Sequence, residues 1–165
     1  SLNNRFLRTP NVEVRELSAE CPEGFEDLKQ SFDTALLLKT LEYSEDPELS
    51  LRQMHTCLVS NGSVIVSVPQ GDGLNSLDRG LGYLHRFARK DIIAALERNG
   101  FTVDRTIELN KVGRLAWGIF GGILKNEKIN KLSLKIFDKT VWLSRLIEPM
   151  LPWSGLNLIV IARKK

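Results

Sequence analysis

Five segments of the chain have the hydrophobic pattern of β-strands. Residues 32–38 end in four consecutive apolar residues, and residues 64–68 are rich in β-branched side chains. Such runs suit strands that are buried on both faces, as in a parallel sheet. Residues 101–109 alternate between apolar and polar positions, and residues 156–162 form a further apolar run. A shorter alternating segment, residues 12–17, predicts a half-buried strand near the start of the chain.

Helical patterns separate these strands. Asp46 and Pro47 form a helix start, with the aspartate as N-cap and the proline at the first helical position. Apolar residues then recur at spacings of three and four as far as Ser-Asn-Gly at 60–62, whose glycine can adopt the left-handed conformation that ends a helix. Residues 89–99 predict a second helix, which Asn-Gly terminates.

The order of the elements predicts an α/β fold. Strands that alternate with helices are typical of a sheet with right-handed crossovers. The last two strands have only a helical excursion between them, so we expect them to pair antiparallel. The 165 residues are enough for one domain. We therefore predict a single domain over residues 1–165, with a mostly parallel sheet whose last strand is antiparallel.

Composition and charge are those of a globular protein. Hydrophobic residues make up 42% of the chain and charged residues 26%, which excludes a disordered tail, a collagen-like rod and a dense disulfide scaffold. The net charge of +3 is too small to indicate a nucleic-acid partner. Cys21 and Cys57 have no metal-ligand spacing and indicate reduced thiols. No signal core and no run of about 18 apolar residues is present, so we expect a cytoplasmic protein. We also expect no bound metal.

Candidate chemistry gathers in the polar and aromatic segment 74–88. In an α/β sheet such a segment lies at the carboxyl ends of the strands, where ligands bind. His85 is a candidate base or substrate contact, and Asp78 is a second catalytic candidate. Asp78 can instead form a bidentate pair with Arg86 that locks the loop. Glu42, which follows the strand at 32–38, either faces a ligand or makes a hydrogen bond between helix and loop.

Two late amphipathic segments, residues 112–124 and 132–150, are unusually aromatic and basic. Their large aromatic side chains are Trp117, Phe120 and Trp142. These residues either pack under the sheet or form an apolar lid or lipid-facing surface, which neighbouring lysines would help to bind a membrane peripherally. We expect the region at about 112–152 to form a helical cap over the carboxyl edge of the sheet.

Six short motifs follow one another along the chain: SFDTAL at 31–36, LEY at 41–43, LVSNGS at 58–63, VSVP at 66–69, LDRGLGYLHRF at 77–87 and LERNGF at 96–101. Their order and spacing resemble the C-terminal two-thirds of a class I S-adenosylmethionine-dependent methyltransferase. The first four look like that family's fourth and fifth strands with their "LEH" and "LKPGG" turns. The fifth resembles an "LDxxLGHxRRY" segment of one subgroup, and the sixth resembles the family's "LEEAGF" before the sixth strand.

The resemblance implies a three-layer Rossmann-like methyltransferase sheet, S-adenosylmethionine as cofactor, and a small or lipid- or glycan-linked methyl acceptor. It places the cofactor near Ser18, Ala19, Glu20, Leu38, Lys39 and Thr40. It places the acceptor near Glu42, Tyr43, Tyr83 and Arg86. The catalytic residue stays unknown, with His85 and Asp78 as candidates, because methyl transfer requires a base only where the acceptor must lose a proton.

The chain also departs from the family pattern. The first two strands and the acidic-x-Gly-x-Gly turn are missing, so the resemblance is to a domain truncated at its N-terminus. Ser18 and Ala19 occupy the place of an acidic residue, with Glu20 one step on, and Tyr43 replaces the histidine of "LEH". Two functions therefore stand beside each other: a methyltransferase or a fragment of one, and a non-catalytic truncated Rossmann-like domain that serves assembly or binding. We expect this chain alone to bind the cofactor weakly or not at all.

The missing strands also predict an assembly. Without them, one edge of the strand at 32–38 is bare, and bare apolar edges tend to associate. Either residues 12–17 pair with this edge, or two chains join through it. We expect a homodimer.

Overall fold

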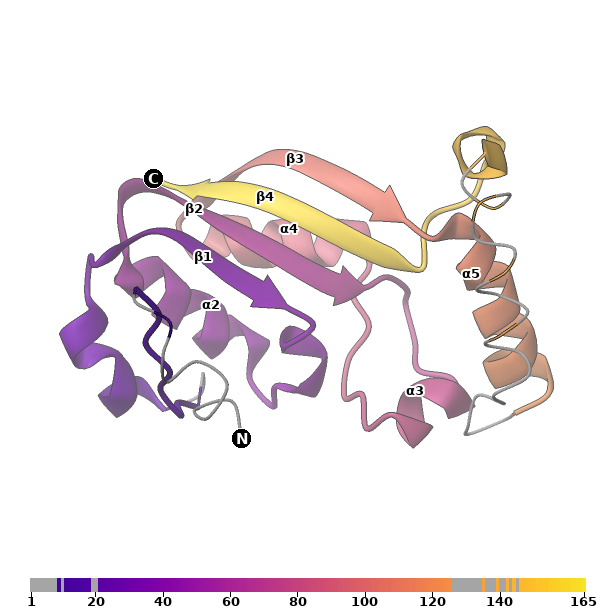
Figure 1. Ribbon diagram of the computed structural model, residues 1–165, viewed down its shortest axis with the longest axis horizontal. Coiled ribbons are helices and arrows are strands. Elements are labelled where there is room, and N and C mark those ends of the chain that lie inside the picture. Colours follow the sequence, from indigo (N-terminus) through magenta and orange to yellow (C-terminus); the bar gives the residue numbers. More distant parts are fainter. Residues whose placement is uncertain are drawn as a thin grey trace.

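The computed structural model describes residue 9, residues 11–18, 21–125 and 146–165, and residues 135, 139, 142 and 144. Four strands form one sheet (Figure 1): β1 (Phe32–Leu38), β2 (Leu58–Pro69), β3 (Phe101–Leu109) and β4 (Asn157–Lys164). Their order across the sheet is β1-β2-β4-β3. β1 pairs parallel with β2, whereas β4 pairs antiparallel with both β2 and β3. The predicted α/β sheet with an antiparallel last strand is thereby confirmed.

The helical elements of the described residues are η1 (Pro22–Leu28), η2 (Leu41–Tyr43), α2 (Pro47–Cys57), α3 (Ser76–Gly80), α4 (Arg89–Arg98), α5 (Lys111–Trp117), the π-helical turn η3 (Gly118–Ile123) and η4 (Glu148–Met150). The start of α2 is as predicted, because the Asp46 carboxylate accepts a hydrogen bond from the Leu49 N–H at 2.9 Å. The end of α4 is also as predicted. Gly100 follows it with φ of 84°, and a Cβ there would lie 2.8 Å from the His55 ring.

The end of α2 differs from the prediction. The helix ends at Cys57 and β2 begins directly at Leu58, so Gly62 lies inside a strand instead of capping a helix. Asn61 takes the left-handed conformation, with φ of 62°. Pairing of Leu58 with Phe32 on β1 extends β2 toward the helix, which the local sequence could not reveal.

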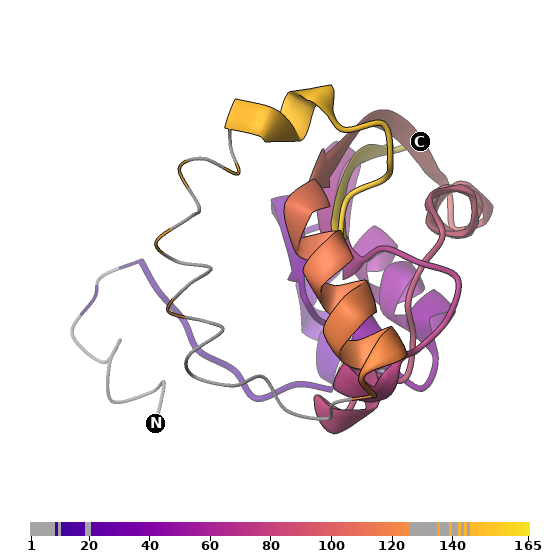
Figure 2. The same cartoon turned by 90° about the vertical axis from the view of Figure 1, so that its right-hand side faces the viewer.

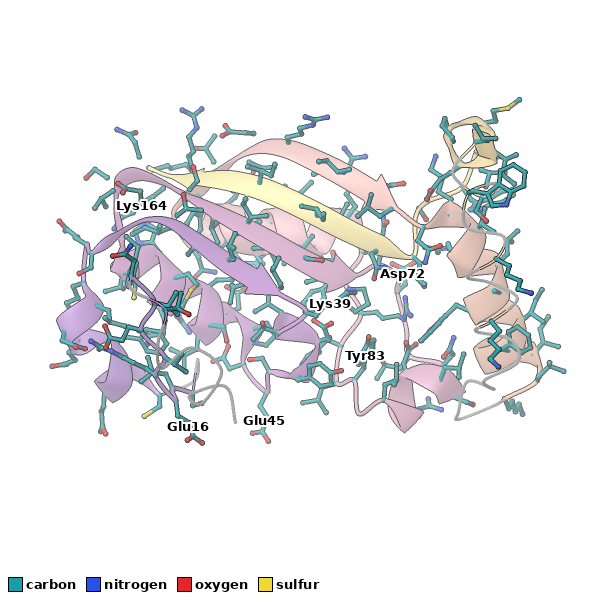
Figure 3. All side chains as sticks on the ribbon, viewed as in Figure 1. Glu16, Lys39, Glu45, Asp72, Tyr83 and Lys164 are labelled. Atoms are coloured by element: carbon teal, nitrogen blue, oxygen red, sulfur yellow. The ribbon has the colours of Figure 1, made fainter. Side chains whose placement is uncertain are left out.

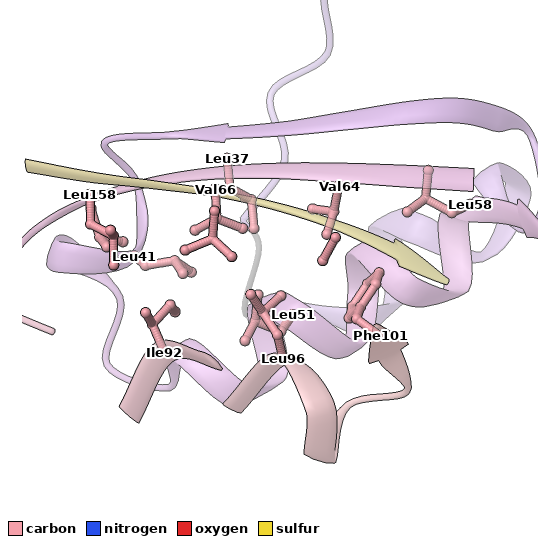
Figure 4. Close-up of a cluster of buried hydrophobic side chains, with 13 residues drawn as sticks. Leu37, Leu41, Leu51, Leu58, Val64, Val66, Ile92, Leu96, Phe101 and Leu158 are labelled. Atoms are coloured by element: carbon pink, nitrogen blue, oxygen red, sulfur yellow. The ribbon is translucent and has the colours of Figure 1, made fainter. Parts of the chain in front are cut away.

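The core lies between the sheet and the helices α2 and α4 (Figure 4). Its buried side chains come from every strand and from both helices: Leu37, Leu51, Leu58, Val64, Val66, Ile92, Leu96, Phe101 and Val160 are examples. The apolar spacing of the two helices is explained by this contact, because one stripe of each helix meets the sheet.

The other face of β1 is open in the described part of the chain. Leu37 points into the core, but Leu36 and Leu38 are 57% and 55% exposed. The expectation that the apolar run of β1 is buried on both faces is therefore wrong. Of the three predicted layers, the described residues supply the sheet and the α2–α4 layer.

The predicted strand at 12–17 is not formed, and all of these residues are exposed. Arg15 instead donates a hydrogen bond to Asp27 of η1 at 2.5 Å. Among the described residues β1 pairs only with β2, so the prediction that 12–17 covers the free edge is wrong. A six-residue alternation specifies which side chains share a face, but it does not provide a hydrogen-bonding neighbour.

The carboxyl ends of β1, β2 and β3 point toward α3 and α5 (Figure 1). Segment 74–88, predicted to be irregular, includes the short helix α3. Seen from that end, α5 lies in front of the sheet (Figure 2). The predicted segment 132–150 falls mostly outside the described residues. No helix in the described ranges is long and apolar enough to cross a membrane.

Candidate functional site

Lys39, Asp72 and Tyr83 lie around the arrowheads of β1 and β2, between the sheet and α5 (Figure 3). Lys39 directly follows β1 with φ of 56°, and its N–H donates to the Ser67 carbonyl of β2 at 3.0 Å. Its ammonium group donates to the side-chain oxygen of Asn157, at the start of β4. The end of β1 is thus tied to both of the next two strands.

Glu42, on η2, is a buried carboxylate with no hydrogen-bond partner among the described residues. Lys39 Nζ lies 3.9 Å from its Oε1 atom, which is too far for a hydrogen bond. The Glu42 carbonyl accepts from the N–H groups of Leu84 and His85, at 2.7 and 3.2 Å. These backbone bonds hold segment 83–85 against η2, and they do not involve the carboxylate oxygens.

Burial dominates the electrostatics of this pair. It raises the pKa of Glu42 above its ordinary value, although Lys39 and Arg86 oppose that rise. Burial likewise lowers the pKa of Lys39, and the attraction of Glu42 offsets this only in part. Desolvation therefore pushes each group toward its neutral form. A bound ligand that donates hydrogen bonds to Glu42 or carries positive charge near it would reverse that cost.

Asp78 is the second buried carboxylate at the carboxyl edge of the sheet, and both of its oxygens accept hydrogen bonds. Arg86 donates to both of its oxygens, at 2.7 and 2.8 Å, as the bidentate pair predicted from the sequence. The Trp117 indole donates to Oδ1 at 3.0 Å, and the Asn75 N–H donates to Oδ2 at 2.9 Å. Burial alone would raise the pKa of Asp78, but these donors hold it below its usual value. The geometry favours the structural interpretation of Asp78 over the catalytic one.

Arg86 extends this network toward β2. Its Nη1 donates to the Gln70 carbonyl at 2.8 Å, and its guanidinium lies 5.7 Å from the centre of the Trp117 ring. Arg86 thus connects the loop, the end of β2 and α5. It positions neighbouring groups, and its charge is compensated by Asp78.

Two aromatic contacts border the Glu42 side of the edge. Tyr43 and Tyr83 meet edge to face with their ring centres 5.3 Å apart. Burial, followed by repulsion from Tyr43 and Glu42, raises the pKa of Tyr83 to about 12. His85 is partly buried, with its ring 5.9 Å from that of Phe87. Glu42, Tyr43, Tyr83 and His85 therefore lie close together; that Glu42, Tyr43, Tyr83 and Arg86 bind an acceptor stays a prediction.

A pocket of about 190 Å³ opens beyond the end of β2, on the other side of Arg86. It is lined by Gln70, Asp72, Arg114, Trp117 and Leu156, among others. Gln70 is 5% exposed, and its Nε2 donates to Glu108 at 3.2 Å. Its Oε1 is buried without a partner among the described residues. The lining of the pocket therefore includes an aromatic side chain and the side chain of Arg114, and Gln70 borders it.

The sequence did not identify Gln70 or Arg114 as site residues. The sequence contained a feature that could have identified Gln70, since a polar residue directly after a buried strand lies at the ligand-binding edge. No sequence feature pointed to Arg114. Among the predicted cofactor residues, Leu38, Lys39 and Thr40 lie at the end of β1, and Ser18 is exposed in an extended segment. Ala19 and Glu20 lie outside the described residues. The described residues contain no group of three or more side chains able to hold a metal ion.

No family model and no curated protein sequence matches this chain. Solved structures do. A methyltransferase from Thermotoga maritima, described as a possible histamine N-methyltransferase, superposes with a TM-score of 0.62 at 16% identity, over 98% of this chain and 68% of that protein. A methyltransferase from Mesorhizobium loti superposes with a TM-score of 0.60 at 16% identity, over 99% and 75%.

These superpositions show that the chain has the fold of the class I S-adenosylmethionine-dependent methyltransferases. A [4+2]-cyclase also superposes, with a TM-score of 0.58 at 14% identity, and the chain spans 59% of its length. One fold thus accommodates different reactions, so the reaction has to be argued from the site.

Proposed function

We propose that the protein functions in S-adenosylmethionine-dependent methyl transfer to a small or lipid- or glycan-linked acceptor. The observation that most supports this is Glu42: a fully buried carboxylate that accepts no hydrogen bond from the described residues, at the strand edge where this fold binds ligands. A burial cost of this kind is retained at sites where a ligand compensates it.

The residues around Glu42 fit a cationic cofactor with hydroxyl and amino groups. S-adenosylmethionine, when bound, supplies a methyl group already activated by its sulfonium centre. Glu42 would accept hydrogen bonds from the cofactor or attract its positive charge. The backbone of Leu38, Lys39 and Thr40 would form the floor beneath it, with Ser18, Ala19 and Glu20 as further proposed contacts.

The acceptor would lie between this cluster and the β2 pocket. Tyr43 and Tyr83 provide an aromatic wall, and Arg86 is held rigid by Asp78. His85 is the proposed base for an acceptor that must lose a proton, because it is a histidine near Glu42 at the carboxyl edge of the sheet. The helical region at about 112–152 is proposed to shape the acceptor site. Trp117 supports this, since its indole reaches Asp78.

The alternative is a non-catalytic Rossmann-like domain for assembly or binding. It is supported by one feature of the chain: residues 1–31 contain no acidic-x-Gly-x-Gly segment, and the run of that pattern at 78–82 lies in and just after helix α3, not after a strand. The turn supplies polar contacts to the cofactor in the family, and each lost hydrogen bond weakens binding by about 1–3 kcal/mol. We therefore expect this chain by itself to bind S-adenosylmethionine far more weakly than a complete domain does.

Titration of ¹⁵N-labelled protein with S-adenosylhomocysteine, followed by NMR, tests both functions. We expect weak binding, with shift changes confined to residues 38–43 and 83–86, and loss of these changes in Glu42→Gln. Tyr43→Phe is the matched control, because it changes an exposed neighbour and leaves the carboxylate in place. Shift changes elsewhere, or none at saturating ligand, would support the non-catalytic function. Micromolar affinity by calorimetry would contradict the expected weakness.

We further propose a homodimer joined through the free edge of β1, where Leu36 and Leu38 are exposed. Apolar area buried there would contribute about 25 cal/mol per Å². Light scattering should give twice the mass of 18.7 kDa, and Leu36→Lys should restore the monomer. A monomeric wild type would refute the dimer. A cytoplasmic location and the absence of a nucleic-acid partner remain proposals.

A further inference from the structure

Helix α5 and the turn η3 turn one side toward the site. On this side Arg114 donates to the Gly155 carbonyl at 3.2 Å, and Trp117 donates to Asp78. Gly121 lies so close to Asn75 that a Cβ would be 2.4 Å from the side-chain oxygen of that asparagine. The glycine therefore allows η3 to pack tightly against the start of α3, which fixes the orientation of the whole element.

The other side of α5 and η3 carries exposed apolar side chains that no other described residue covers. Leu115, Ile119 and Ile123 recur at a spacing of four residues and are 50%, 48% and 76% exposed. Leu124 follows with 55% exposure. Four large aliphatic side chains in one stripe exceed the scattered apolar residues of an ordinary surface, and such stripes mark interaction sites.

A second group of exposed apolar side chains lies close to the start of α5. Leu146 and Met150 are 66% and 82% exposed. The Lys111 N–H donates to the Glu148 carboxylate at 2.6 Å, and Lys111 Nζ donates to the Leu151 carbonyl at 2.9 Å. These bonds tie η4 to α5. We refer to Leu115, Ile119, Ile123, Leu124, Leu146 and Met150 together as the apolar stripe.

The charge of this region indicates what covers the stripe. Residues 111–150 contain eight Lys or Arg and three Asp or Glu, for a net charge of +5, whereas the rest of the chain has a net charge of −2. Lys125 directly follows the stripe, and Lys135 and Lys139 are exposed. A second copy docked face to face through this region would bring +5 against +5, which disfavours self-association here. An anionic surface would be complementary.

We propose that the apolar stripe docks this protein on the surface of an anionic lipid bilayer. Apolar side chains flanked by lysines are the pattern of helices that lie in the interface, with the aliphatic groups in the acyl boundary and the ammonium groups at the phosphates. The docking does not depend on methyl transfer. One further step rests on the proposed function. If the protein also transfers methyl groups to a lipid-linked acceptor, docking would bring the pocket on the opposite face of α5 close to the head groups of the bilayer.

Co-sedimentation with vesicles tests the proposal. We expect the full chain to bind vesicles of phosphatidylcholine containing phosphatidylglycerol, and to bind phosphatidylcholine alone at least about tenfold more weakly. Ile123→Glu should weaken binding to the anionic vesicles by roughly tenfold. Lys125→Glu should do so by a similar factor, and added salt should weaken binding further.

Leu17→Glu is the matched control, because it introduces the same carboxylate at an exposed leucine outside the stripe and outside the proposed dimer edge, and it should leave vesicle binding unchanged. Circular dichroism of each variant shows that the fold is kept. Equal binding to neutral and anionic vesicles, no binding by the wild type, or equal loss in Leu17→Glu and Ile123→Glu would overturn the proposal. So would a wild-type dimer that Ile123→Glu dissociates, since the stripe would then be covered by a second copy.

Discussion

Asp78 and Glu42 are both fully buried carboxylates at the carboxyl edge of one sheet, but their surroundings differ. Asp78 accepts four hydrogen bonds, two of them from Arg86, whereas Glu42 accepts none from the described residues. Their pKa values shift in opposite directions, below the usual value for Asp78 and above it for Glu42. Burial is therefore not what distinguishes a structural acid from a candidate ligand-binding one; satisfaction of its oxygens is.

The two environments follow from the elements that hold them. Asp78 lies in the capping box of α3, where its side chain and that of Asn75 bond each other's backbone N–H groups. Arg86 and Trp117 then reach it from a loop and from α5. Glu42 lies on a short 3₁₀ turn whose backbone, not its side chain, holds the neighbouring loop. The first arrangement stabilises the edge, and the second leaves it ready for a ligand.

The largest effect is expected from removing Arg86. Arg86→Leu leaves the Asp78 carboxylate buried without its cation, and breaking a buried pair in this way costs about 3–5 kcal/mol. Urea unfolding measures the loss. The matched control is Arg163→Leu, because Arg163 makes an equally short bidentate pair with Asp104, at 2.7 and 2.9 Å, but on the surface. Its loss should be far smaller. Equal losses would show that burial does not separate the two pairs.

Replacing Glu42 should raise the free energy of unfolding, whereas replacing Arg86 lowers it. Glu42→Gln removes a desolvated charge and should raise the free energy of unfolding at pH 7 by about 1 kcal/mol. In the wild type, Glu42 stays protonated in the folded state above its ordinary pKa of 4.5, while the unfolded chain releases the proton. Stability therefore falls as pH rises from 4.5 through the folded-state pKa. This fall should be reduced in Glu42→Gln, as unfolding curves across that pH range would show. A variant less stable than wild type at pH 7 would contradict the burial argument.

Asp78 should give the reverse pH dependence. Its folded-state pKa lies below the ordinary value of 3.8, so the stability it contributes is present above that value and is lost as pH falls through the folded pKa. Asp78→Asn should flatten the acid limb of the stability curve and leave the slope due to Glu42 in place. An unchanged acid limb would mean that Asp78 does not titrate differently in the folded and unfolded states.

Replacing Lys39 should have a smaller effect, a shift in the pKa of Glu42. Its ammonium group lowers the Glu42 pKa across 3.9 Å without a hydrogen bond. Lys39→Met should therefore raise the pKa of Glu42 further, which ¹³C NMR of the glutamate carboxyl groups measures. Lys90→Met, an exposed lysine on α4, is the control. A Glu42 pKa that does not move would place the charge of Lys39 too far away to matter.

Tyr83 provides the smallest effect. The chain has two tyrosines, so Tyr83 is the only one left in Tyr43→Phe. Its pKa of about 12 is raised first by burial and also by Tyr43 and Glu42. Adding Glu42→Gln to Tyr43→Phe should lower the phenol pKa, read from phenolate absorbance, whereas adding Asp104→Asn should not. An equal midpoint in both double variants would show that Tyr83 does not sense the Glu42 charge.

The sequence by itself determined the elements whose causes are local. The Asp-Pro start of α2, the alternation of 101–109 and the Asn-Gly end of α4 specify caps and periodicity within a few residues, and the structure forms each as predicted. The pairing of Asp78 with Arg86 was also accessible, because eight residues in one loop separate two complementary groups. The order of strands and helices was sufficient for the α/β sheet.

Only the tertiary structure decided which surfaces are covered and which polar groups are satisfied. Residues 12–17 have a strand pattern but no neighbour, and Leu36 is apolar but uncovered. Gln70 and Glu42 lie next to ordinary strand ends, and that their oxygens receive no donor from the described residues depends on how segments far apart in the chain pack. Local patterns specify what a segment can bury or bond. Whether it does so depends on residues far away in the chain, such as Trp117 reaching Asp78 across 39 positions.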